Sequence, residues 1–226
     1  MEGIVKEITV SQLFSLEETI AKELFENVIY PWEVLPKIGD FILKLGATLS
    51  RDDYDLIGDD VWIAKSAQVV PSAHVNGPTI ICANADIRHC AYIRGNVIIG
   101  EGAMVGNSTE VKNALLFNAV QVPHFNYVGD SILGYKAHLG AGAITSNVKG
   151  DSSLVSVQLE QGSLDTHLKK FGAILGDYVE VGCNTVLNPG TVVGKNSQFY
   201  PLSFVRGFVP ANQIYKKQGE VVEKRR

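Results

Sequence analysis

An apolar residue recurs at every sixth position over a long part of this 226-residue chain. The series comprises Ile57, Ile63, Val69, Val75, Ile81, Ile87, Ile93, Ile99, Val105, Val111 and Phe117. All but the last are β-branched. With 46% hydrophobic residues in the chain, chance would fill one fixed register in this way with odds of about two in ten thousand, so the series is a repeat.

The repeat continues beyond Phe117 with changes of phase. Val122, Val128, Leu133 and Leu139 follow at gaps of five or six residues. After an interruption the series returns as Leu175, Val181, Leu187, Val193, Phe199 and Val205. Glycine often follows the apolar residue, as in "IIGEGAMVG" and "LGAGAI".

A six-residue period matches neither the 3.6-residue period of a helix nor the two-residue alternation of a strand. It fits short parallel strands joined by tight corners, where Gly, Asn and Asp tolerate positive φ. The sequence therefore predicts an all-β solenoid over residues 57–206, the hexapeptide form of the parallel β-helix. With three sides to a coil, residues 57–145 give about five coils and residues 174–205 give nearly two.

Three segments fall outside the repeat. Residues 1–56 are predicted to form an N-terminal α-helical cap, with two helices that cover the open first coil. A capping box of Ser15 and Glu18 starts the first helix, and Gly46 ends the second. Residues 146–173 break the six-residue phase, which predicts a long loop excursion where sites often lie. Residues 207–226 are predicted to be a C-terminal tail that frays.

Composition narrows the classes of partner. The net charge of −4 argues against a nucleic-acid partner. We expect no membrane partner, because no secretory leader and no bilayer-length apolar run is visible. Cys82, Cys90 and Cys183 form no Cys-x-x-Cys pair and suit free thiols, so we expect a cytoplasmic location.

A specific pattern lies within the repeat, at residues 124–147. The stretch "HFNYVGDSILGYKAHLGAGAITSN" reads His-x-x-Tyr-x-Gly-Asp and then Gly-Ala-Gly-x-Ile-Thr-x-Asn. Together with the coil, it resembles the hexapeptide acyltransferases. The closest resemblance is to the archaeal-type acetyltransferase domain of the bifunctional glucosamine-1-phosphate acetyltransferase/N-acetylglucosamine-1-phosphate uridyltransferase family, over residues 57–205. No Gly-rich nucleotide loop near the start matches the nucleotidyltransferase half.

This resemblance implies a left-handed parallel β-helix and a homotrimer with active sites between subunits. It also implies an acetyl-CoA-dependent N-acetyltransferase that acts on glucosamine-1-phosphate or a similar aminosugar phosphate in UDP-N-acetylglucosamine biosynthesis. Acetyl transfer from a thioester needs a neutral amine, and an imidazole can take the amine's proton as it attacks. By the family match this general base is His124. Backbone N–H groups of the Gly140–Gly142 corner would face the oxyanion.

The resemblance assigns binding residues as well. Arg94 and Lys112 match the cations that contact the sugar phosphate, and Tyr127 and Asn147 match the contacts to the sugar. Ala141 and Cys183 match the contacts to the coenzyme. His138, Ser153 and Ser156 depart from the family pattern, which usually has an asparagine at the first position and lysines near the other two. These departures leave the identity of the acceptor open.

Other classes fit parts of the pattern. Taken alone, Arg94 and Lys112 are typical of solvated corner charges, Tyr127 could pack on a face, and Asn147 could cap a turn. The γ-class carbonic anhydrases share the coil but bind zinc through histidine pairs that this chain lacks, so no metal is expected at the site. A non-catalytic scaffold or regulatory protein remains an alternative, as does an acyltransferase for another aminosugar or a nucleotide sugar.

Overall fold

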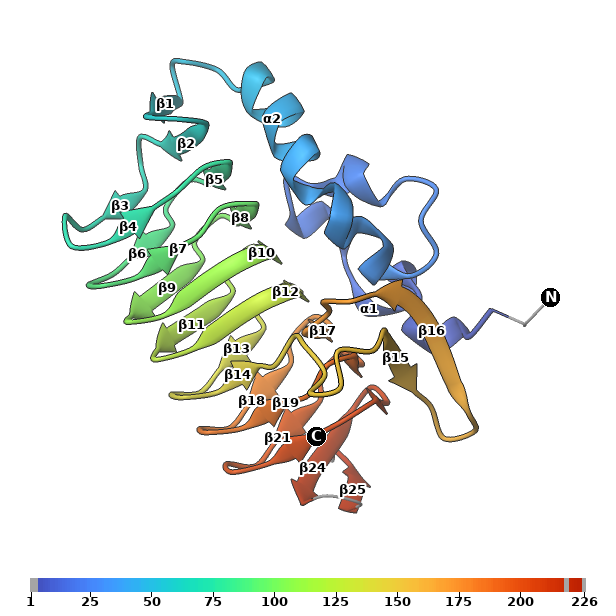
Figure 1. Cartoon of the computed structure of the whole chain (residues 1–226). Helices are drawn as coiled ribbons and strands as arrows, with labels where there is room; N and C mark the ends of the chain where they lie inside the picture. The colour runs from blue at the N-terminus through green and yellow to red at the C-terminus, as the bar shows by residue number, and fades with distance from the viewer. Residues whose placement is uncertain (1–3, 218–219, 225–226) are drawn as a thin grey trace.

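The computed structural model describes residues 4–217 and 220–224, and most of them form one parallel β-solenoid (Figure 1). Each coil has three sides. The first side consists of β2 (Val61–Ala64), β5 (Thr79–Ile81), β8 (Val97–Ile99), the second halves of β10 (Glu110–Leu116) and β12 (Tyr127–Leu133), β17 (Ala173–Leu175), β20 (Thr191–Val193) and β23 (Phe208–Val209). The second side consists of β3 (Gln68–Val69), β6 (Asp86–Ile87), β9 (Met104–Asn107), β11 (Gln121–His124), β13 (His138–Leu139), β18 (Glu180–Val181), β21 (Gln198–Phe199) and β24 (Gln213–Lys217). The third side consists of β4 (His74–Val75), β7 (Tyr92–Ile93), the first halves of β10 and β12, β14 (Ile144–Thr145), β19 (Val186–Leu187) and β22 (Phe204–Val205).

Backbone pairing between coils follows the repeat. Ile63 pairs with Ile81, and Ile81 with Ile99, at an offset of 18 residues. Ile99 then pairs with Leu116, and Leu116 with Leu133, at an offset of 17 residues. The sequence prediction of an all-β solenoid built from parallel coils is confirmed, with five coils over residues 61–145 and two over residues 173–205.

Two residues of the predicted series were placed wrongly. Leu116, rather than Phe117, is the partner of Ile99, so the change of phase comes one residue earlier. Phe117 is still fully buried, because its ring packs against Phe14 and Phe25 of the N-terminal segment, with ring centroids 4.9 and 6.0 Å away. The other error is Ile57, which lies 54% exposed in β1 (Tyr54–Ile57). Strand β1 pairs antiparallel with β2 and covers that edge of the sheet.

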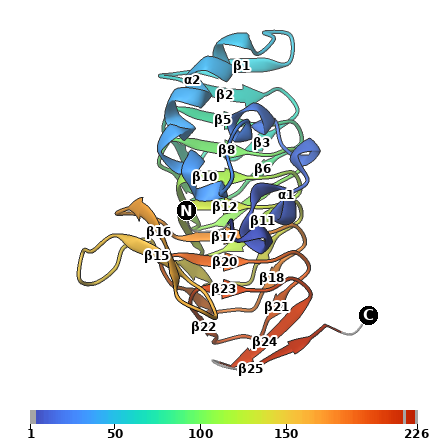
Figure 2. The same cartoon turned by 90° about the vertical axis from the view of Figure 1, so that its right-hand side faces the viewer.

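The N-terminal segment covers the first side of the solenoid and not its open end, which corrects the predicted cap (Figures 1 and 2). It consists of α1 (Val10–Leu13), α2 (Ile38–Thr48) and the short 3₁₀ turns Lys6–Ile8, Leu16–Glu18, Lys22–Phe25 and Pro31–Lys37. The helix predicted from Ser15 onward is absent. The Ser15 amide donates to Asp177 Oδ2 of the solenoid at 2.9 Å, and the side chain forms no cap. Contacts to the solenoid thus override the local helical period.

Gly46 has a different role from the predicted helix stop. Helix α2 continues through Gly46 to Thr48. A Cβ atom at Gly46 would lie 2.4 Å from the indole ring of Trp62, so the glycine allows α2 to approach the first coil closely.

Residues 146–173 leave the solenoid between β14 and β17. They form an antiparallel hairpin of β15 (Val155–Gln158) and β16 (Ser163–Leu168) beside the later coils (Figure 1). Val155 and Val157 are buried, and Phe171 stacks near Trp32 with ring centroids 5.7 Å apart. The excursion is therefore a packed hairpin that stands next to the third side.

The C-terminal segment differs from the predicted tail. Strand β23 pairs with β20, and β24 pairs with β21, so the solenoid continues past residue 206. Strand β25 (Glu220–Glu223) turns back along β24 and closes this end as an antiparallel hairpin. Residues 218–219 and 225–226 of the predicted tail lie outside the described residues.

A matched pair of substitutions on β11 tests the inward register. Val122 is fully buried and its neighbour Gln121 is exposed. Val122→Asp should lower stability by about 3–5 kcal/mol, because it places an unpaired charge in a dry interior. Gln121→Asp should melt within about two degrees of the parent. Equal melting temperatures for the two variants would show that the register is wrong.

Candidate functional site

The candidate site begins as a column of outward-facing residues on the third side. The Arg94 amide donates to the Val111 carbonyl, so Arg94 lies one coil before Lys112. Lys112 pairs with Gly129 of the next coil, and Ser146 follows one coil later. Because paired strands lie about 4.8 Å apart, Arg94 and Lys112 are neighbours despite the 18 residues between them.

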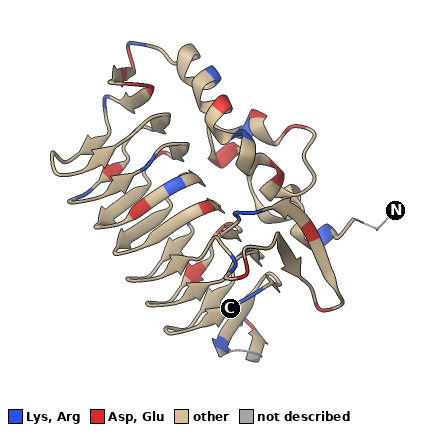
Figure 3. Ribbon diagram, viewed as in Figure 1, with Lys and Arg blue, Asp and Glu red and all other residues tan. Residues whose placement is uncertain are grey.

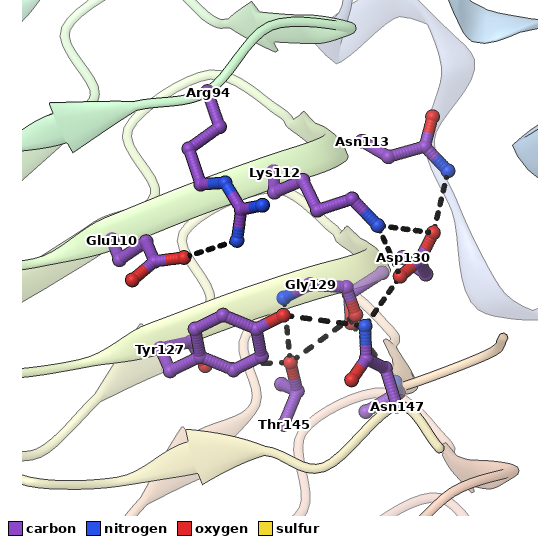
Figure 4. A network of polar contacts seen from close by, with 11 residues as sticks. Arg94, Glu110, Lys112, Asn113, Tyr127, Gly129, Asp130, Thr145 and Asn147 are labelled. Atoms are coloured by element: carbon purple, nitrogen blue, oxygen red, sulfur yellow. Dashed lines mark hydrogen bonds and ion pairs between the residues drawn. The ribbon is translucent and has the colours of Figure 1, made fainter.

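Asp130 is the centre of a polar network in this region (Figure 4). It occupies a corner of β12 with φ 48° and is 4% exposed. Its carboxylate accepts hydrogen bonds from Lys112 Nζ at 3.2 Å, from Asn113 Nδ2 at 2.9 Å and from Asn147 Nδ2. Three donors, one of them cationic, compensate the buried charge.

Tyr127 and Asn147 extend the network toward the open face. Asn147 Nδ2 donates to the Tyr127 hydroxyl at 3.2 Å. Burial raises the pKa of Tyr127, and the nearby charges of Asp130 and Glu110 raise it further. The phenol therefore keeps its proton at neutral pH, and its O–H can donate to a ligand.

The two cations of the site are already paired with carboxylates. Arg94 Nη1 lies 2.7 Å from Glu110 Oε1, and Lys112 lies 3.2 Å from Asp130. Figure 3 shows an acidic and a basic position close together on β10. The four formal charges of these two pairs cancel.

A second line of residues runs along the corner between the second and third sides. The Gly142 amide donates to the His124 carbonyl at 3.0 Å, and the Asn184 amide donates to the Ala141 carbonyl at 2.8 Å. His124, Ala141 and Cys183 therefore occupy equivalent positions in successive coils. His124 and Cys183 are exposed, and His124 lies three residues before Tyr127, across one corner from the Asp130 network. Its side chain is not part of that network.

The expected set of oxyanion donors is narrower than predicted. The Gly140 amide donates to the Val181 carbonyl at 2.7 Å, and the Gly142 amide donates to His124. Neither N–H is free for a ligand. Within the described residues, the Ala141 amide makes no backbone or side-chain hydrogen bond, so it is the donor that this corner leaves available.

Asn126 fixes the corner that carries His124, and the sequence analysis missed it. Its side chain is buried, accepts from the His124 amide at 3.1 Å and donates to the Gly140 and Ala143 carbonyls at 2.8 and 3.0 Å. Asn126 thus ties the His124 corner to the Gly140–Ala143 corner.

Glu110, Asn113 and Asp130 were missed too. Asp130 stood in the quoted Gly-Asp pattern, which was the available signal. For Glu110 and Asn113 the sequence carried no signal beyond their proximity to Lys112.

The residues that depart from the family pattern lie in different places. His138 lies on the second side, where its Nδ1 is 2.8 Å from Glu180 Oε2. Ser153 lies in the excursion and accepts a hydrogen bond from Lys149 Nζ at 2.6 Å. Ser156 lies on β15. His138 therefore stands apart from the Asp130 network.

Helix α2 adds a wall to the site. A pocket of about 400 Å³ lies between α2 and the solenoid, lined on the helix by Gly39 and Asp40. Asn96, Lys112 and Asp130 line its opposite wall. The Asp130 network is thus accessible from the side of α2 as well as from the third side.

The described residues contain no group of three His, Cys, Asp or Glu side chains that could hold a metal ion. Among the same residues, no helix has the length and apolar content needed to cross a membrane.

Known proteins share this chain's pattern. A family model described as GMPPB C-terminal domain matches residues 75–198. The bifunctional protein GlmU of Methanococcus vannielii is 31% identical over 99% of this chain and 54% of its own length. The putative uncharacterized acetyltransferase YaiX of Escherichia coli is 30% identical over 73% of this chain and 71% of its own length. The chain spans about half the length of the GlmU relatives that it matches.

A solved structure of a putative acetyltransferase from Bacillus cereus matches more distantly. It has a TM-score of 0.45 and 17% identity, over 64% of this chain and 77% of its own.

A double-mutant cycle tests whether Lys112 and Asp130 act as a unit. Lys112→Met alone should cost about 1–3 kcal/mol, because it leaves the buried carboxylate short of a partner. Combined with Asp130→Asn, the coupling energy from urea denaturation should be about 0.5–3 kcal/mol. The exposed pair Lys22 and Glu17 is the control and should show no measurable coupling. Equal coupling for the two pairs would contradict the network.

Proposed function

This chain belongs to the GMPPB C-terminal domain family, and from that premise we propose that it is an acetyl-CoA-dependent N-acetyltransferase acting on an aminosugar phosphate. The observation that supports this most is the arrangement of two groups of residues. His124, Ala141 and Cys183 follow one corner of successive coils, and Arg94, Lys112, Tyr127 and Asn147 gather on the adjoining third side. A coenzyme along the corner and a sugar on the third side would meet at His124.

In the proposed reaction the acceptor amine attacks the thioester carbonyl of acetyl-CoA. His124 takes the amine's proton as the C–N bond forms. The Ala141 N–H is the candidate donor to the tetrahedral oxyanion. When the C–S bond breaks, the coenzyme thiolate leaves and takes up the proton from His124. The products are the N-acetylated sugar and free coenzyme A, and no metal enters the reaction.

Tyr127 and Asn147 are proposed to bind the sugar. Their linked hydroxyl and amide groups can exchange hydrogen bonds with sugar hydroxyls, and Asp130 holds Asn147 in place. Arg94 and Lys112 are proposed to face the anionic part of the acceptor. Their carboxylate partners fix the direction of both side chains before a ligand binds.

The assembly proposed is a homotrimer with the site between subunits. Large apolar side chains are exposed along the third side and its corner, among them Tyr92, Phe125 and Phe204. A second copy against this side would cover them. We place the reaction in the cytoplasm, with UDP-N-acetylglucosamine biosynthesis as its setting, and the three free cysteines agree with a reducing compartment.

The substitution His124→Ala tests the catalytic role. The rate of single-turnover acetylation at saturating substrates should fall about 10²- to 10⁴-fold with the melting temperature unchanged, because His124 is exposed and makes no side-chain hydrogen bond. His89→Ala, at a corner of an earlier coil, should retain the parent's rate. If His124→Ala also reacted at the parent's rate, another group would have to take the proton.

Alkylation of the cysteines tests the coenzyme track. Cys82 is buried and its pKa is raised to about 12 by that burial, whereas Cys90 and Cys183 are exposed. At pH 7.5, iodoacetamide should therefore label Cys90 and Cys183 and spare Cys82, because the thiolate is the reactive form. Acetyl-CoA should slow labelling of Cys183 and leave Cys90 unchanged, as followed by peptide mass spectrometry. Unchanged labelling of Cys183 would place the coenzyme elsewhere.

A further inference from the structure

The cations assigned to the acceptor's phosphate leave a charge problem. Arg94 and Lys112 are each held by a carboxylate, so the site around Asp130 offers a dianion no net positive charge. Asp130 is buried and cannot easily turn away from Lys112. An uncompensated cation close to this site would suit a phosphate group better.

A pocket with that property lies two coils further along the third side. Its volume is about 500 Å³, and it is bounded by the solenoid on one side and by the excursion on the other. Ser146, Asn188 and Arg206 form the solenoid wall. They continue the column of Lys112, with one residue from each coil, because the Ser146 amide donates to Leu187 and the Asn188 amide donates to Val205. Lys149 and Ser156 contribute from the excursion.

The charges that line this pocket do not cancel. Lys149 lies 3.8 Å from Asp151 and 2.6 Å from Ser153 Oγ. Hydrogen bonds from Ser153, first from its backbone amide, lower the pKa of Asp151, so this carboxylate is ionised at neutral pH. The Arg206 guanidinium makes no hydrogen bond or ion pair with the described residues and is exposed. Two cations face one anion, and the other polar groups are neutral donors.

From this arrangement we propose that the pocket of Lys149, Ser156, Asn188 and Arg206 binds a phosphate ester of a substrate. This inference rests on the proposed function, since it names the group that the same site must hold. Asn147 stands between Ser146 and Lys149 in the chain, so a sugar on Tyr127 and Asn147 would have the pocket as its neighbour. Arg206 supplies a planar pair of N–H donors, and Ser156 and Asn188 complete the phosphate's hydrogen bonds.

Two substrates carry such a group, the acceptor sugar and the coenzyme. Direct binding measured by calorimetry tests the pocket itself, with inorganic pyrophosphate as the probe. Arg206→Gln and Lys149→Gln should each weaken pyrophosphate binding about tenfold, whereas Lys65→Gln on the first coil should leave it unchanged. Equal affinity in the parent and both pocket variants would overturn the proposal. The proposed function fails in a different way, if the parent acetylates no aminosugar phosphate.

Two further titrations identify the source of the phosphate. If the acceptor supplies it, the pocket variants should raise the KM for glucosamine-1-phosphate about tenfold and leave the KM for glucosamine and the affinity for coenzyme A unchanged. If the coenzyme supplies it, they should weaken coenzyme A about tenfold and leave dephospho-coenzyme A, which lacks the 3′-phosphate, unchanged. Variants that leave both substrates at the parent's values would contradict the proposal.

Discussion

Parallel pairing between coils is the constraint on which the rest of the structure depends. Each coil pairs its backbone with the next at an offset of 17 or 18 residues, and this offset sets which outward residues become neighbours. Arg94 and Lys112 meet because they stand one coil apart, and His124, Ala141 and Cys183 line up for the same reason. A shift of one residue in the register would turn these side chains to the opposite face of the sheet.

Two kinds of polar interaction hold the candidate site on this scaffold. Asp130 uses its buried carboxylate to orient Lys112, Asn113 and Asn147. Asn126 uses its amide to join the corner of His124 to the next coil. Both side chains are buried and fully bonded, so they position groups that themselves stay open to a ligand. A rigid solenoid with such corners orders the site before any substrate arrives.

The sequence predicted the solenoid well because each coil repeats one local rule, with an apolar residue inward and a permissive corner. The phase series located nearly every inward position and failed at Phe117, whose burial comes from Phe14 and Phe25. The N-terminal helices were less predictable, since contacts to the solenoid decide their shape. The roles of Asp130 and Asn126 escaped prediction for a similar reason: each depends on side chains one coil away.

The central claim is that this chain transfers an acetyl group to the amine of a sugar phosphate. Mass spectrometry of reactions with acetyl-CoA and a panel of aminosugar phosphates, with the unphosphorylated sugars alongside, tests it directly. The account predicts an N-acetylated sugar phosphate formed in step with free coenzyme A. Release of coenzyme A without any acetylated sugar, or no reaction with any member of the panel, would contradict it and favour a non-catalytic scaffold.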